Sequence, residues 1–360
     1  MRQQTRDPQP DPTGGAPASP EVTVVVPARN EVRTIDACLD AVLDQQGVDL
    51  EVVVVDNGSD DGTAERLAAR AATDPRLRVL HNPVPSIPAS LNAAVAAARG
   101  RWLVRVDAHS TVPPSYVARA VSRLAEGRWV GVGGRKSAVG RTPAGRAVAA
   151  VLNSRLAVGG STYHYGTRET VVDHIPFGAY PTALVRELGG WDESIPNNED
   201  FEFDQRLRSR GELLFDPELE IAWQARDDVR QLFTQYRRYG RGKPQVALRH
   251  PGSVKLRHLA PPALVLWLGA AAATALRRPR LAALAVAPYA AAVGTAAAVI
   301  DRSTPPGTDR RAVPLALVAM QVGWGLGFWE GVRDVVRART GRAPAVTRAD
   351  GGGPGGGPAR

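Results

Sequence analysis

From residue 22 onward, short apolar runs alternate with stretches of helical periodicity. The runs VTVVV, EVVVVD, LRVLHN and WLVRVD are separated by helix-like segments around 35–43, 64–72 and 90–99. Strands that are apolar on both faces need cover on both faces, and strands that alternate with helices are typical of a parallel sheet. This alternation predicts an α/β fold for the first part of the chain.

Polar residues follow several of these runs. PARNE follows the first, DNGSDDGT the second and DAHS the fourth. Ligands of parallel sheets bind at the carboxyl ends of the strands, so these residues are predicted to form a site together.

The C-terminal third has a different composition. Three apolar segments without charged residues, 259–276, 281–300 and 312–329, are separated by RRPR and DRSTPPGTDRR. Each is long enough to cross a hydrocarbon core of roughly 30 Å. The alternative is a soluble helical bundle, because alanine favours insertion far less than leucine; the absence of charge favours membrane segments.

The orientation of these segments conflicts with the distribution of charge. If all three cross from a cytoplasmic domain, RRPR and the arginines after Trp329 face outward, against the positive-inside tendency. One segment is therefore expected to lie in the interface or to re-enter, which leaves two to three transmembrane segments.

These patterns predict four regions. Residues 1–20 are expected to be a disordered segment without a secretory signal, 21–250 a catalytic α/β domain, 251–335 a membrane-associated helical region and 336–360 a disordered tail rich in Gly and Pro. The single cysteine excludes an intrachain disulfide. The net charge of +9 suits a polyanionic substrate, nucleic acid or an anionic membrane equally well.

The first two strand ends offer groups for a nucleoside. Pro27 ends the first strand and places Arg29 and Glu31 at the sheet edge, although Glu31 would equally suit the first turn of a helix. Asp56 ends the second strand, where a carboxylate can accept hydrogen bonds from a base or a ribose. Asp60 is interpreted as a turn residue.

The fourth strand end offers candidate metal ligands. Asp107 and His109 are two residues apart, so both can point to one side of an extended segment. A carboxylate with an imidazole suits a divalent ion. A solvated Asp and a hydrogen-bonded His are the alternative for this tripeptide alone.

Two later motifs supply acidic and basic side chains. In NNEDFEFDQRLRSRG, Glu199 and Asp200 precede a helix that has Phe203 and Leu207 on one face; they either complement the helix dipole or supply a general base. In QLFTQYRRYGRGK, Arg238 and its basic neighbours can contact a diphosphate or membrane lipid.

In order and spacing, PARNE, DNGSDDGT, VDAH and NNED resemble the family 2 inverting glycosyltransferases, whose catalytic fold is the Rossmann-like GT-A fold of nucleotide-diphospho-sugar transferases. RVDAH, NNEDFEFDQRLRSRG and QYRRYGRGK look most like the ExoA-like branch, typified by a succinoglycan biosynthesis protein. The resemblance covers roughly residues 21–243.

This resemblance implies roles for individual residues. Pro27, Glu31 and Asp56 would contact the nucleoside of the donor. Asp107 and His109 stand at the Asp-x-Asp position of the family, with His in place of the second acid. Asp200 falls on the catalytic base, with Glu199 in support.

The implied activity is hexose transfer, with inversion, from a nucleotide-diphosphate sugar, expected to be UDP-linked. The implied cofactor is Mg²⁺ or Mn²⁺, and the implied acceptor is a polyprenyl-linked sugar or a cell-surface polysaccharide. The resemblance also implies a cell-membrane location, with the catalytic domain on the cytoplasmic face. Tyr239 replaces the Trp of the Gln-x-x-Arg-Trp motif of processive synthases, which weakens a claim of processivity.

Three other functions fit the sequence less well. A nucleotidyltransferase would need a Gly-rich phosphate loop after its first strand, and PARNE has no glycine. An inactive membrane scaffold with this fold would not need Asp56, Asp107 and Asp200 together. Nucleic-acid binding lacks a recognisable reader motif.

Overall fold

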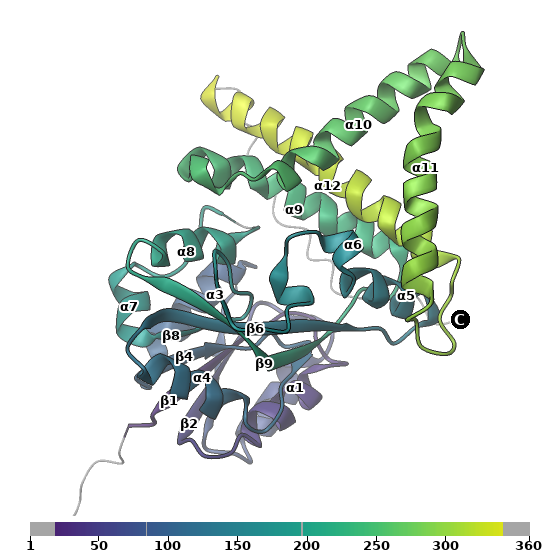
Figure 1. The fold of residues 1–360 in the computed structure, drawn as a ribbon. Coiled ribbons are helices and arrows are strands. Elements are labelled where there is room, and N and C mark those ends of the chain that lie inside the picture. The colour runs from purple at the N-terminus through teal and green to yellow at the C-terminus, as the bar shows by residue number, and fades with distance from the viewer. Residues whose placement is uncertain (1–18, 84, 196, 341–360) are drawn as a thin grey trace, which may run out of the picture.

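The computed structural model describes residues 19–83, 85–195 and 197–340. The disorder expected of residues 1–18 and 341–360 therefore falls outside the described residues. Within them, an α/β domain carries three long helices at its C-terminal end (Figure 1).

One mixed sheet forms the centre of the domain. Its strand order is β3-β2-β1-β4-β8-β6-β9-β5, with β7 also paired to β9. The parallel strands expected from the sequence are β1 (Val22–Ala28), β2 (Leu50–Asp56), β3 (Leu77–His81) and β4 (Trp102–Arg105). The remaining strands are β5 (Ser110–Thr111), β6 (Trp129–Val139), β7 (Thr170–Val172), β8 (Ala179–Pro181) and β9 (Glu212–Gln224).

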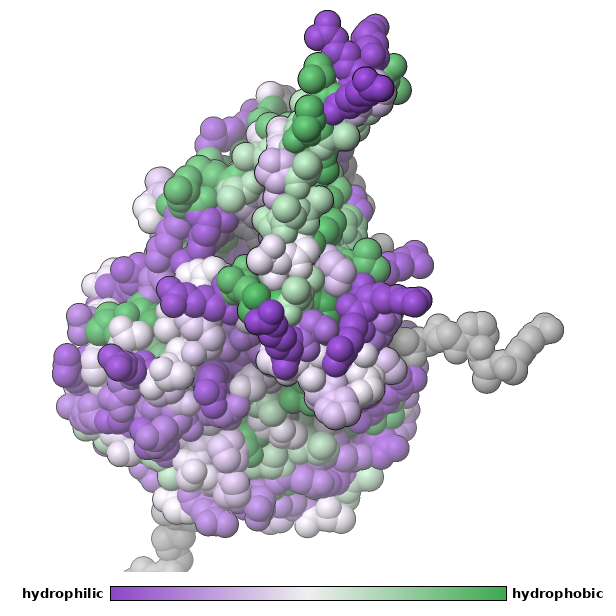
Figure 2. All heavy atoms as spheres, turned by 45° about the vertical axis from the view of Figure 1, so that its right-hand side comes forward, coloured by the Kyte–Doolittle hydropathy of each residue, from purple (hydrophilic) through white to green (hydrophobic). Residues whose placement is uncertain are grey.

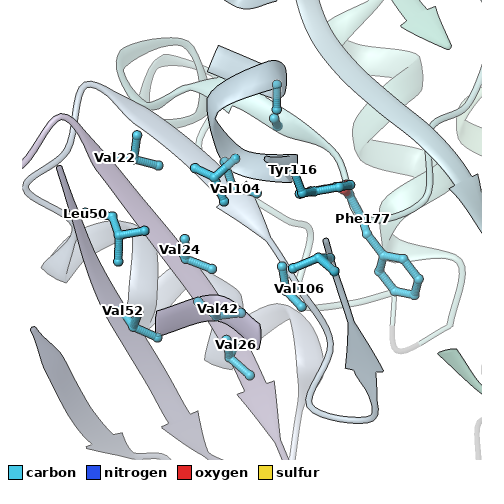
Figure 3. Close-up of a cluster of buried hydrophobic side chains, with 14 of the residues drawn as sticks. Val22, Val24, Val26, Val42, Leu50, Val52, Val104, Val106, Tyr116 and Phe177 are labelled. Atoms are coloured by element: carbon cyan, nitrogen blue, oxygen red, sulfur yellow. The ribbon is translucent and has the colours of Figure 1, made fainter. Parts of the chain in front are cut away.

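Helices cover both faces of the sheet, as buried strands require. On one face, Val24, Val52 and Val104 pack against Leu39 and Val117 (Figure 3 shows part of this cluster). The helices of this face are α1 (Ile35–Leu43), α2 (Thr63–Ala71) and α4 (Tyr116–Ala125). On the other face lie α3 (Ile87–Ala97), α7 (Thr182–Glu187) and α8 (Glu199–Leu207).

A second set of helices lies beyond the sheet. Its buried core joins α5, α9, α11 and α12. The elements of this part are α5 (Pro143–Leu152), α6 (Arg155–Val158), the 3-10 turns η1 (Thr162–His164) and η2 (Pro251–Ser253), α9 (Val229–Arg249), α10 (Leu256–Ala275), α11 (Pro279–Asp301) and α12 (Ala312–Arg339).

By length and composition, α10, α11 and α12 could each cross a membrane, but they differ in burial. In their most apolar stretches, 11% of the residues of α10, 6% of those of α11 and 50% of those of α12 are buried inside the structure. The last helix is thus partly a component of the folded domain.

Three boundaries differ from those expected. β1 continues through Pro27 to Ala28, because the amide that proline lacks is not needed so close to the end of a strand. α3 begins at Ile87, where Ser86 caps it. α12 ends at Arg339, beyond the expected boundary at 335, and two arginines of α9 pair with Glu330 and Asp334 shortly before that boundary.

Candidate active site

A cavity of about 810 Å³ opens between the sheet and the C-terminal helices. Five of the predicted site residues line it: Asp107, His109, Glu199, Asp200 and Arg238. They come from the end of β4, the start of α8 and the middle of α9. The fold thus brings together motifs that are as far as 131 positions apart, from Asp107 to Arg238.

The residues predicted for the nucleoside lie along the neighbouring edge of the sheet. Ala28 at the end of β1 is paired with Asp56 at the end of β2, and Asp56 is paired with His81 at the end of β3. Asp56 is buried, 3.2 Å from His81 Nδ1, and accepts a hydrogen bond from the Ser59 amide. Pro27, Arg29, Glu31 and Asp56 are outside the lining of the cavity among the described residues.

Glu31 connects the two parts of the site. Its Oε1 lies 3.0 Å from His109 Nδ1, and its backbone amide donates a hydrogen bond to Thr63 Oγ1. A carboxylate on Nδ1 fixes the orientation of an imidazole and leaves Nε2 as the ring nitrogen for a ligand. Glu31 thus contacts His109 in this structure, and the nucleoside contact that the resemblance implied stays a prediction.

Arg105 organises the acids at the bottom of the cavity. Its guanidinium is buried, donates from Nε to Asp107 Oδ1 at 2.9 Å, and lies 3.6 Å from Glu199 Oε1. Arg105 Nη1 is buried and has no hydrogen-bond partner among the described residues. Since a buried guanidinium N–H needs an acceptor, Nη1 is a donor that the described residues leave unsatisfied.

The two acids that begin α8 have opposite shifts of pKa. Burial raises the pKa of Glu199, and the charge of Asp200 raises it further. Burial would also raise the pKa of Asp200, but the positive charges of His174 and Arg105 outweigh this and hold the pKa below its usual value. Asp200 is thus kept ionised, which a proton acceptor must be.

The raised pKa of Glu199 predicts an effect on stability. Its contribution is fully present below the usual pKa of 4.5 and is lost as the pH rises through the raised pKa of the folded state. Glutamine stays neutral at all these pH values. We expect Glu199→Gln to raise the midpoint of thermal unfolding in detergent at pH 8, and to raise it less at pH 5. An equal shift at both pH values would contradict this.

Several residues of the cavity were not found from the sequence. Lys136 of β6 places its Nζ 3.9 Å from the ring centre of Trp223 and 4.7 Å from that of Phe177. Burial lowers its pKa to about 8, against the attraction of Asp107 and Asp200. A GRKS segment inside a strand carries no signal for such a position.

A second buried pair supports α8. His174 Nδ1 lies 2.7 Å from Asp204 Oδ2, which also accepts a hydrogen bond from the Ile175 amide. Burial raises the pKa of Asp204 to about 6. Burial lowers the pKa of His174, but the hydrogen bond to Asp204 outweighs this and the pKa is raised. His174 can therefore supply the positive charge that keeps Asp200 ionised.

The far wall of the cavity comes from the C-terminal helices. His258 of α10 stacks on Trp324 of α12 with 6.1 Å between ring centres, and both line the cavity. Tyr239 and Lys243 of α9 face the same space. The motif QYRRYGRGK thus lies in the middle of a long helix. Some of its side chains line the cavity and others contact α12.

The cavity offers few candidate metal ligands among the described residues. No three His, Cys, Asp or Glu side chains converge as a metal cluster in residues 19–83, 85–195 and 197–340. Asp107 and His109 remain as a pair on one cavity wall. Mg²⁺ is commonly held by one or two side chains together with phosphate oxygens of the substrate, so such a pair fits a site that a nucleotide completes.

Comparison with known proteins agrees with this geometry. Residues 23–180 match the family model described as "Glycosyl transferase family 2". The chain is 33% identical over 326 residues to the succinoglycan biosynthesis protein ExoA of Rhizobium meliloti (strain 1021), covering 87% of this chain and 96% of ExoA. It is 27% identical over 284 residues to the pre-mycofactocin glycosyltransferase of Mycobacterium tuberculosis, covering 77% and 58%.

The sheet is also similar to that of a solved transferase. A mannosyltransferase from Pyrobaculum calidifontis, solved with GDP-Man and Mn²⁺, superimposes with a TM-score of 0.54 at 24% identity, over 92% of this chain and 91% of that one. The fold and the cavity define a GT-A glycosyltransferase. The chain belongs to glycosyltransferase family 2, and its similarity to ExoA extends over almost its whole length.

Proposed function

We propose that this enzyme transfers a hexose from a nucleotide-diphosphate sugar, UDP-linked, to a lipid-linked or polysaccharide acceptor at the membrane. The observation that carries the proposal is the cavity in which an ionised Asp200 faces the same space as Asp107, His109 and Arg105. The reaction is a single displacement with inversion. The acceptor oxygen bonds to the anomeric carbon as the bond to the diphosphate breaks, and Asp200 takes the hydroxyl proton.

Positive side chains are available for the departing diphosphate. Arg105, Lys136, Arg226 and Arg238 all line the cavity. The negative charge that develops on the diphosphate is stabilised by fixed cations in a water-poor site. The contacts of Arg105 with Asp107 and Glu199 fix the position of its charge, which supports its assignment to this role.

Asp107 and His109 would hold a divalent ion, Mg²⁺ or Mn²⁺, with oxygens of the diphosphate. Such an ion acts as a Lewis acid on the leaving group. The Glu31–His109 hydrogen bond supports this assignment, because carboxylates commonly orient metal-binding imidazoles in this way. The proposed nucleoside contacts are Pro27, Arg29, Glu31 and Asp56, at the edge of the sheet beside this pair.

The proposed location is the cell membrane, with the catalytic domain on the cytoplasmic face. Basic residues flank the apolar helices on the side of this domain, which supports that orientation. The wall of the cavity that α10 and α12 form supports an acceptor that reaches the site from the membrane.

A donor screen tests the proposed function. Protein purified in detergent would be incubated with UDP-, GDP- and dTDP-sugars with Mg²⁺ or Mn²⁺, and release of nucleoside diphosphate would be measured, with Asp200→Asn as the control. We expect release from a UDP-hexose and none from the control. Nucleotide binding without release from any donor would favour an inactive scaffold instead.

A further inference from the structure

The last helix is joined to α9 by glycines. Gly323, Gly327 and Gly331 recur at every fourth position of α12, and a Cβ on each would press against the carbonyl oxygens of Phe233, Arg237 and Arg241 respectively. We call this contact the glycine seam. Both sets of residues advance by four in the same direction, so the two helices run parallel with their backbones in contact. Small residues at this spacing permit such an approach.

Two ion pairs continue the seam. Arg237 Nε lies 2.8 Å from Glu330 Oε1, and Arg241 Nε lies 2.6 Å from Asp334 Oδ2. The arginines are about half exposed, so each pair adds little to stability. Their position matters more than their energy. If α12 crossed a bilayer along its length, these charges would enter the hydrocarbon or lose their partners, and either is costly.

The partner helix is itself fixed in the catalytic domain. α9 follows β9 directly, and the Asp228 side chain caps it at the Gln231 amide with a distance of 2.8 Å. A Cβ at Gly242 would lie 2.6 Å from Asn198 Nδ2, at the start of α8. α9 therefore cannot move into a membrane without breaking the site, and the seam holds α12 beside it.

The two other apolar helices are nearly uncovered. α10 and α11 form a hairpin that projects from the domain (Figures 1 and 2). Leu266, Trp267, Leu281 and Leu284 are among its exposed side chains. At 1.5 Å per residue, the uncharged segments 259–276 of the first helix and 281–300 of the second are about 27 Å and about 30 Å long, close to the thickness of the hydrocarbon core. The hydrophilic tip of the hairpin in Figure 2 consists of RRPR at 277–280.

We propose that the α10–α11 hairpin crosses the lipid bilayer and that α12 does not. The catalytic domain and the end of α12 then lie on one side, and RRPR lies on the other. Lipid is the occupant that fits the hairpin, because arginines at the tip and basic residues at the base bracket its apolar length at both phosphate layers. The basic residues at the base are Lys255, Arg257, Arg302, Arg310 and Arg311.

This arrangement reduces the conflict over charge, because only RRPR remains on the far side. With three crossings, the arginines at 333, 337 and 339 would join RRPR on the far side. With one hairpin they stay with the catalytic domain, so Lys and Arg are in excess there, as the positive-inside tendency requires. The proposal goes beyond the enzymatic function and does not depend on it.

Side-specific labelling tests the topology. Single cysteines would be introduced as Glu65→Cys in the catalytic domain, Arg278→Cys at the tip, Ser303→Cys after α11 and Ala338→Cys near the end of α12. Intact spheroplasts and inverted vesicles would be treated with a membrane-impermeant maleimide. The unsubstituted protein is the control, because its Cys38 is buried.

We expect the variants at 65, 303 and 338 to be labelled from one side and the variant at 278 from the other. Labelling at 338 from the same side as 278 would show three crossings and overturn the proposal. Labelling at 278 from the same side as 65 would show that the hairpin does not cross, and that a second copy or another protein covers it.

The glycine seam is tested separately. Gly327→Leu would force α12 away from Arg237, whereas Gly294→Leu, on α11, is the matched control because a Cβ there has no heavy atom within 4 Å. In detergent, trypsin should cleave the end of α12 at least about tenfold faster in Gly327→Leu than in the control. Equal cleavage rates would show that the seam does not hold α12.

Discussion

Asp200→Asn should lower the turnover number by about 10²- to 10⁴-fold while the dissociation constant of the donor changes little. Asparagine keeps the size of the side chain and can still accept the hydrogen bond from the Phe201 amide, which lies 2.7 Å from Asp200 Oδ1. It cannot accept a proton from the acceptor hydroxyl. Initial rates of transfer and calorimetric titration with the nucleoside diphosphate would measure the two quantities.

Glu199→Gln is the matched control for this prediction. The two residues are adjacent and both line the cavity, but Glu199 has a raised pKa and points toward Arg105. We expect this variant to retain much more activity than Asp200→Asn. If Glu199→Gln is inactive and Asp200→Asn is not, the roles are reversed. If both variants keep normal turnover, the base is another residue.

Asp107→Ala should abolish transfer, a loss on the order of 10³-fold or more, because it weakens the electrostatic stabilisation of the leaving diphosphate by the proposed metal ion and by Arg105. The carboxylate is the partner of Arg105 Nε and one of the two candidate metal ligands. Its loss would leave the guanidinium misplaced and would remove one of the two proposed ligands of the divalent ion that neutralises the diphosphate. Transfer assays together with circular dichroism would separate loss of activity from loss of fold.

A suitable control is Asp60→Ala, because Asp60 is an exposed turn residue whose backbone amide, not its carboxylate, bonds to Asn30 Oδ1. This variant should behave like the unsubstituted protein. Full activity of Asp107→Ala, or undiminished activity of the unsubstituted enzyme in EDTA, would remove the metal from the proposed mechanism.

The sequence predicted the first four strands and the polar residues at their ends because these signals are local, whereas the later strands of the mixed sheet were not predicted. Buried parallel strands need continuous apolar runs, and polar residues after such runs mark the ligand edge. α8 begins at Glu199 and buries Phe203 and Leu207, as the spacing indicated. These features depend on residues that are close together in the chain.

Features built from distant residues were not predicted. α9 was not recognised as a helix, because Gly240, Gly242 and Pro244 oppose helix formation on intrinsic propensity. In the folded protein, Gly240 and Gly242 are needed where Trp324 and Asn198 approach the backbone. The His174–Asp204 pair and the ring contacts of Lys136 likewise depend on tertiary packing. Such packing produces no regular spacing of residue types that could be recognised in the sequence.

The glycine seam makes the catalytic part and the C-terminal part inseparable. Shortening the chain at residue 250 would not release an independent soluble enzyme. It would remove His258 and Trp324 from the wall of the cavity and would expose the backbone of α9 that now packs against α12. Exchange of C-terminal regions between relatives should likewise succeed only when both helices of the seam are exchanged together.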